Sequence, residues 1–117
     1  MTTSPRFSRG DVVLVPFGFT SGAGSKRRPA IVVSATGYNR VTPDRIVASV
    51  TGNLGGLSHP GDHILADWQA AGLAKPSLAQ TKLATVDAAV VGRRLGSLIR
   101  ADLAAFDRGL RTALDLS

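Results

Sequence analysis

The sequence predicts a mainly β protein of the α+β class, in which a small barrel of short strands carries one C-terminal α-helix. Two patterns support this fold. Short runs of β-branched and apolar residues, separated by Gly- and Pro-rich segments, fill the first two thirds of the 117-residue chain. The remainder changes to a spacing of three and four residues between apolar positions, which is typical of an amphipathic helix packed on a sheet. A chain of this length is expected to form one domain over residues 1–117, with residues 1–6 as a disordered tail.

The expected strands are short and apolar, and they are bounded by turn-forming residues. The first contains Pro16, which lacks an N–H group and therefore either ends the strand or places it at a sheet edge. A Gly/Ser-rich segment at residues 18–26 and a second glycine-containing segment at 52–62 are predicted to be loops. The six expected strands cover residues 11–17, 29–34, 45–51, 63–65, 77–86 and 90–94.

Two helical segments are predicted in the second half of the chain. Residues 67–72 form one short helical turn, with Asp67 as its cap and Gly72 as its stop. Residues 99–116 form the long amphipathic helix, with Asp102 in its first turn, where a carboxylate favours the helix dipole. The apolar face of this helix packs on the barrel or at a dimer interface, and it is too narrow for a membrane-surface role. That face consists of Ile99, Leu103, Phe106, Leu110 and Leu114.

The charge of the chain suits a polyanionic partner. Fourteen Lys and Arg residues oppose eight acidic residues, and eleven of the fourteen are Arg. Arginine pairs with phosphate through two parallel hydrogen bonds, so an Arg-rich excess favours nucleic acid, although a merely soluble basic domain has the same composition. With no cysteine, no transmembrane-length apolar run and no visible secretory signal, we expect a cytoplasmic protein without membrane association.

Conventional catalytic and metal-binding patterns are missing from the sequence. His59 and His63 flank Pro60-Gly61, so they cannot share a helix face as a ribonuclease histidine pair. No Cys- or His-rich ligand set is present, so neither a metal nor another cofactor is expected. His63 could contact a base or be an ordinary strand residue, and Trp68 could stack on a base or belong to the core.

Several segments, taken in order, carry a family resemblance. They are RGDVVLV at residues 9–15, SKRRPAIVVS at 25–34, IVASVT at 46–51, LAKPS at 73–77, LATVD at 83–87 and RRLG at 93–96. No single segment is specific, but their order and spacing resemble the MazF/PemK toxin family over residues 7–116. Two positions depart from the usual pattern: Gly52-Asn53 replaces Ser-Gln or Ala-Gln after the Thr, and Ile99-Arg100 replaces a Ser cap at the last helix.

The resemblance implies both a fold and an activity. It implies an SH3-like barrel that forms a homodimer, cleaves single-stranded RNA sequence-selectively without a metal, and is inhibited by a cognate antitoxin protein. It also implies that Arg28 fills the family's catalytic Arg position and Thr51 its catalytic Thr position. The Gly52-Asn53 departure leaves the RNA sequence preference, and activity itself, open.

Metal-independent RNA cleavage uses the 2′-OH of the RNA as the nucleophile and leaves a 2′,3′-cyclic phosphate. We assign Arg28 the electrostatic role, since its planar guanidinium can hold two phosphoryl oxygens, whereas a guanidinium stays protonated in proteins and is a poor acid or base. Thr51 would hydrogen-bond the 2′-OH or a phosphoryl oxygen, with proton transfer left to water. The plain alternatives are an extended residue before Pro29 and an ordinary threonine at a strand end.

The expected RNA-binding set surrounds these two residues. A basic run borders the Gly-rich loop, and each phosphate neutralised on a single strand adds ~0.7 to the salt slope of binding. Two other functions stay open: a nucleic-acid-binding module without catalysis, which includes a member that has lost activity, and a CcdB-like toxin that acts on a protein target. The candidate RNA-binding residues are Ser25, Lys26, Arg27, Asn53 and Lys82.

Overall fold

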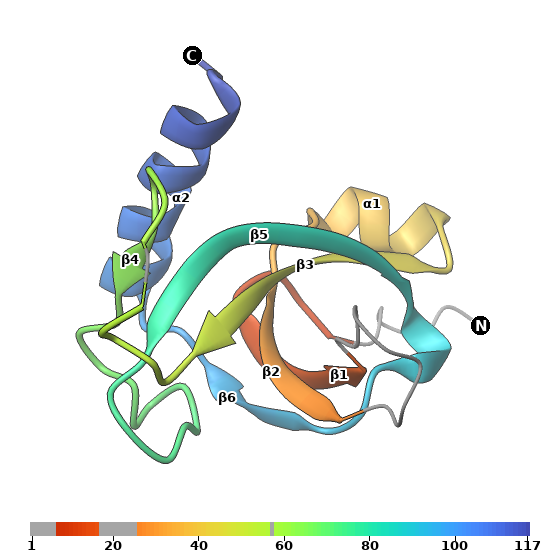
Figure 1. Cartoon of the computed structure of the whole chain (residues 1–117). Helices are drawn as coiled ribbons and strands as arrows, with labels where there is room; N and C mark the ends of the chain where they lie inside the picture. The colour runs from red at the N-terminus through yellow and green to blue at the C-terminus, as the bar shows by residue number, and fades with distance from the viewer. Residues whose placement is uncertain (1–6, 17–25, 57) are drawn as a thin grey trace.

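The computed structural model describes residues 7–16, 26–56 and 58–117, and these form a curved sheet with one long helix at its side (Figure 1). The predicted tail at residues 1–6 and most of the predicted loop at 18–26 lie outside the described residues. In chain order the elements are β1 (Asp11–Pro16), β2 (Arg27–Val32), α1 (Thr36–Val41), β3 (Asp44–Thr51), β4 (His63–Ile64), β5 (Leu78–Asp87), the 3-10 helix η1 (Ala88–Val90), β6 (Arg94–Ser97) and α2 (Arg100–Leu114).

All six strands belong to one antiparallel sheet with the order β4-β5-β3-β2-β1-β6. The sheet coils strongly, so that β1, β2, β3, β5 and β6 wrap around a common axis as a half-barrel (Figure 1). This confirms the predicted mainly β fold with a C-terminal helix. The sheet bends at two irregularities in register: one between β1 and β6, and one in β5 opposite β3. Such irregularities add local twist and bend the strand that carries them.

The central strands are buried on both faces, which explains their uninterrupted apolar sequences. Successive residues of a strand point to opposite sides, so neighbours such as Val12 and Val13 enter two different clusters. The larger cluster lies between the sheet and α2, where Phe106 and Leu110 meet Ile31. The smaller cluster, on the other face, comprises Val13, Val15, Ala30, Val32, Val47 and Val91.

The predicted C-terminal helix is confirmed, but it is shorter than expected. It begins at Arg100 after the extended residue Ile99 and ends at Leu114, because Asp115 adopts a left-handed conformation with φ of 56°. The helix packs by Phe106 and Leu110, while its C-terminal end projects beyond the sheet (Figure 1). Among the described residues, no helix is long and apolar enough to cross a membrane.

The structure corrects three local predictions and adds one helix that the sequence did not predict. Pro16 ends β1, but β1 lies between β2 and β6, so the sheet-edge alternative is wrong. Residues 67–72 form hydrogen-bonded turns instead of a helix, although Asp67 does accept from the Ala70 N–H at 3.0 Å and Gly72 has a positive φ of 77°. The sixth strand is Arg94–Ser97 and not residues 90–94. Helix α1 was not predicted, since its six residues lack apolar periodicity.

Two sets of long-range hydrogen bonds hold α2 against the rest of the fold. The guanidinium of Arg9 grips both carboxylate oxygens of Asp107 and also donates to the Val33 carbonyl at 3.1 Å. Near the other end of the helix, the buried Asp102 holds the segment that follows β4. Trp68 lies in that segment and packs, partly buried, against the larger cluster, as its core alternative predicted.

Candidate active site

Arg28 and Thr51 project from the same end of two neighbouring strands. The β2–β3 ladder ends with the pair Ala30 and Ser49, and Arg28 and Thr51 each lie two residues beyond this pair. Because side chains alternate along a strand, Arg28 and Thr51 point to the same side of the sheet as that pair. Arg28 is exposed and Thr51 is half-buried. The structure therefore puts both residues on one side of the sheet, as a shared site requires.

The hydroxyl of Thr51 is oriented by the turn that follows β3. Its Oγ1 accepts the backbone N–H of Asn53 at 3.1 Å, and the Asn53 side chain in turn accepts the N–H of Gly55 at 3.2 Å. A threonine hydroxyl that accepts in this way still has its own hydrogen to donate. Asn53 thus shapes the turn, and its side-chain oxygen is already committed to Gly55.

The other predicted RNA-binding residues occupy different places. Lys26 is exposed immediately before β2, while the Arg27 side chain turns aside and donates to the Val90 carbonyl at 3.0 Å. Lys82 is exposed on β5, four residues from Leu78, the partner of Thr51 in the ladder. This separation is about 13 Å along an extended strand. Ser25 lies outside the described residues.

Lys75 is a cation that the sequence prediction missed. Its side chain lies across Gly52, the residue after Thr51: a Cβ atom built on Gly52 would lie 2.1 Å from Cε and 3.1 Å from Nζ of Lys75. Lys75 itself is exposed. The only sequence signal was its place in the LAKPS segment, and nothing in that segment indicates which strand end the lysine reaches.

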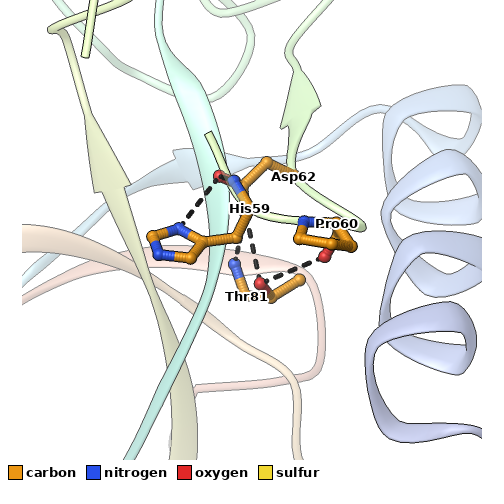
Figure 2. A network of polar contacts seen from close by, with 4 residues as sticks. All are labelled: His59, Pro60, Asp62 and Thr81. Carbon is orange, nitrogen blue, oxygen red and sulfur yellow. Dashed lines mark hydrogen bonds and ion pairs between the residues drawn. The ribbon is translucent and has the colours of Figure 1, made fainter. Parts of the chain in front are cut away.

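The loop between β3 and β4 is anchored to β5 by one buried carboxylate (Figure 2). Asp62 Oδ1 accepts both the backbone N–H of Thr81 at 2.8 Å and the Thr81 hydroxyl at 3.2 Å. Its Oδ2 accepts the backbone N–H of His59 at 2.9 Å, while the exposed His59 ring lies 3.8 Å away. The network closes the loop that begins at Gly52 and holds it at the irregular part of β5.

A second carboxylate anchors the far end of this region. Asp102 is buried and accepts the backbone N–H groups of Ala66 and Asp67 at 2.8 and 2.9 Å, and its Oδ1 lies 2.8 Å from Nε2 of His63. Burial by itself raises the pKa of Asp102, but the hydrogen bonds from Ala66, Asp67 and His63 outweigh it and hold the pKa below its usual value. His63 is therefore tied into this network, which favours its strand-residue alternative over base contact.

The described residues contain no group of three or more His, Cys, Asp or Glu side chains that is arranged to hold a metal ion. What the site presents instead is a guanidinium and a hydroxyl at two strand ends, with further cations nearby. Such a set can bind a phosphodiester and stabilise negative charge that develops on it.

Comparison with known proteins identifies a family for most of the chain. Residues 8–114 match the model of the family described as PemK-like, MazF-like toxin of type II toxin-antitoxin system. No match is found among curated proteins.

Several solved structures are similar in fold. An endoribonuclease in complex with its cognate antitoxin from a mycobacterial species is 21% identical with a TM-score of 0.75, and the alignment covers 94% of this chain and 96% of that one. A MazE–MazF complex from Deinococcus radiodurans is 24% identical with a TM-score of 0.72, covering 94% and 97%. The Mycobacterium tuberculosis toxin MazF-mt6 is 20% identical with a TM-score of 0.69, covering 93% and 99%.

Proposed function

The chain belongs to the PemK-like, MazF-like family of toxins of type II toxin-antitoxin systems, and on that premise we propose that it is an endoribonuclease that cleaves single-stranded mRNA sequence-selectively and without a metal. The observation that carries this proposal is the placement of Arg28 and Thr51 on one side of the sheet, each just beyond the last β2–β3 pair. Solved structures of the same fold are named endoribonucleases, one with its cognate antitoxin.

The proposed reaction is a transesterification within the RNA. The 2′-oxygen forms a bond to the adjacent phosphorus, the bond from phosphorus to the 5′-oxygen breaks, and the products are a 2′,3′-cyclic phosphate and a free 5′-hydroxyl. Water accepts the 2′-OH proton and another water protonates the leaving oxygen. Arg28 holds the non-bridging oxygens, where negative charge grows in the transition state. Thr51 forms a hydrogen bond with the 2′-OH or with a phosphoryl oxygen and keeps its own proton throughout.

The partners follow from the family and from the surface. A type II toxin has a protein antitoxin as its inhibitor, and we propose that this chain acts in the cytoplasm, where its mRNA substrate is. We also propose a homodimer. A groove of about 320 Å³ between the sheet and the end of α2 is lined mostly by apolar side chains, with the charged Arg9, Asp107 and Arg111 among them, and its lining residues Leu114 and Leu116 are 51% and 58% exposed. Exposed apolar surface of this kind favours association with another protein surface.

The experiment that tests the activity uses the purified chain and single-stranded RNA in EDTA. We expect fragments that end in a 2′,3′-cyclic phosphate, and far slower formation of these fragments with the Arg28→Ala variant. Intact RNA that stays bound to the wild-type chain would overturn the nuclease and identify a binding module. Intact RNA without binding would instead direct the search to a protein target.

A further inference from the structure

Gly52 has no backbone reason to be glycine. Its φ lies outside the positive range that L side chains avoid, so an alanine would fit the local conformation. What occupies the place of a side chain is Lys75, whose Cδ, Cε and Nζ atoms would lie 3.2, 2.1 and 3.1 Å from a Cβ atom on Gly52. The three atoms nearest to the missing side chain, apart from its chain neighbours, all belong to the lysine, so the absence of a Cβ atom makes room for it.

The backbone that carries Lys75 is held in place. Ser77 Oγ donates to the Lys75 carbonyl at 2.8 Å, and Pro76 restricts the residue before it to extended geometry. Immediately after Ser77, which is buried, Leu78 begins β5 opposite Thr51. The backbone of Lys75 is therefore fixed beside the end of β3, and only its four-carbon side chain can change conformation.

We infer that Gly52 and Lys75 form a coupled pair that delivers an ammonium group to the RNA phosphate next to Thr51. This inference rests on the proposed function and adds a second cation-bearing position to the site, beside Arg28. An ammonium is a compact charge with three rotatable donors, so it suits a phosphate whose orientation varies, whereas the Arg28 fork suits the scissile phosphate. The residue at position 52 then controls the site through the lysine, without contacting RNA itself.

The pair also accounts for the sequence departure at Gly52-Asn53. A serine or alanine at position 52 would meet the far end of the lysine side chain and displace it, at little cost to the fold because that end is flexible. Glycine at position 52 is therefore the condition for this pose of Lys75, and the departure marks an added phosphate contact instead of a lost activity.

The test is a double-mutant cycle with Lys75→Ala, Gly52→Ala and the double variant. Single-turnover cleavage of a single-stranded RNA is measured for each, together with binding of a 2′-O-methyl RNA of the same sequence over a range of salt. We expect Lys75→Ala to lower cleavage about tenfold, in line with one charge-assisted hydrogen bond, and to reduce the salt slope by ~0.7. Gly52→Ala should act in the same direction and add nothing further in the Lys75→Ala background.

Arg40→Ala is the matched control, since this exposed arginine lies on α1, before β3 begins and thus at the opposite end of that strand from Thr51. Lys75→Arg keeps the charge and should retain most of the cleavage. If the wild-type chain cleaves RNA while Lys75→Ala behaves like Arg40→Ala, the inference is wrong and the nuclease stands. If the losses in cleavage rate of Gly52→Ala and Lys75→Ala multiply in the double variant, the two residues act independently and the proposed coupling is wrong. If the wild type never cleaves but Lys75→Ala still lowers the salt slope, the nuclease is wrong and the phosphate contact stands.

Discussion

Gly61 and Gly109 bring the loop before β4 into direct backbone contact with helix α2. A Cβ atom on Gly109 would lie 2.0 Å from the Gly61 carbonyl oxygen, and one on Gly61 would lie 2.3 Å from the Gly109 carbonyl oxygen. Gly61 also has a positive φ of 93°. Neither clash can be relieved by a side-chain rotation, because the opposing atoms belong to the backbone. The contact therefore sets how closely the anchored loop approaches the helix.

Gly109→Ala is expected to destabilise the fold even though alanine is the better helix former. Separating the two backbones should cost about 1–3 kcal/mol in the free energy of unfolding, as overpacking typically does. Urea denaturation measures the change. Gly37→Ala is the control, because it lies in α1 with nothing within 4 Å of the added Cβ and should be neutral or slightly stabilising. Equal stability of the two variants would contradict the tight crossing.

Asp102 is expected to make stability dependent on acid pH. Its pKa is lowered in the folded state relative to ~3.9 in the unfolded chain, so its contribution is fully present above about pH 4 and is lost as the pH falls through the folded pKa. Asp102→Asn should lower the free energy of unfolding at pH 7 by about 1–3 kcal/mol, because one of the N–H groups of Ala66 and Asp67 loses its acceptor on a buried side chain. It should also flatten the decline in stability below pH 4, measured by urea denaturation across pH. An unchanged decline would show that other carboxylates carry it.

Arg28 is expected to act by charge and geometry. Arg28→Ala should reduce single-turnover cleavage by about 100- to 1000-fold, the usual effect of removing one group that stabilises an oxyanion. Arg28→Lys keeps the charge but loses the fork, so its rate should fall between those of Arg28→Ala and wild type. Because the side chain is exposed, thermal unfolding should be unchanged in both variants. Near-wild-type cleavage in both would end the assignment.

Two substitutions of Thr51 by residues of similar size test whether its hydroxyl takes part in cleavage. Thr51→Ser retains the hydroxyl and should keep cleavage within about tenfold of wild type, whereas Thr51→Val removes its hydrogen bond to the reacting groups and should lose about 100-fold or more. Both variants should be checked for the turn at Asn53, since valine also removes the acceptor of its N–H group. Chemical shifts of residues 52–56 report on that turn. Equal rates for serine and valine would assign Thr51 a purely structural role.

The proposed homodimer is expected to depend on the end of α2. Replacing both Leu114 and Leu116 with glutamate should place charge in the apolar groove and shift the chain to monomers, as measured by sedimentation equilibrium. The exposed Arg108→Glu variant on the same helix is the charge control. If both variants remain dimeric, the groove serves a different surface contact.

Strand positions were predictable because burial on both faces leaves an apolar run that turn residues interrupt. The same reliance on apolar composition gave the wrong bounds for β6. Val90 and Val91 are residues typical of strands, yet Val90 ends the 3-10 helix η1 and Val91 belongs to the smaller cluster. Helix α1 has no apolar periodicity from which it could have been predicted. It is held instead by Asn39, whose amide donates to the Ser34 carbonyl at 3.1 Å. Local composition does not contain such a contact.

The candidate site divides in the same way. Arg28 and Thr51 were proposed as candidates because each belongs to a segment that resembles the toxin family, and their common side of the sheet follows from strand register. Lys75 was not, because its place depends on an empty volume above a glycine in another segment. The role of Asp102 was also only half predicted: the helix position was evident, but its partners Ala66 and Asp67 lie 36 and 35 residues away in the chain.

The early end of the β2–β3 ladder has a consequence for how such an enzyme can diversify. Beyond Ala30 and Ser49 the two strands have no further ladder pairing with each other, so Arg28 pairs with Val15 of β1 and Thr51 pairs with Leu78 of β5. On the proposed function, we expect exchanges of the exposed residues there to alter substrate choice with little penalty in foldability, so that a lineage can acquire a new RNA target while its scaffold stays the same.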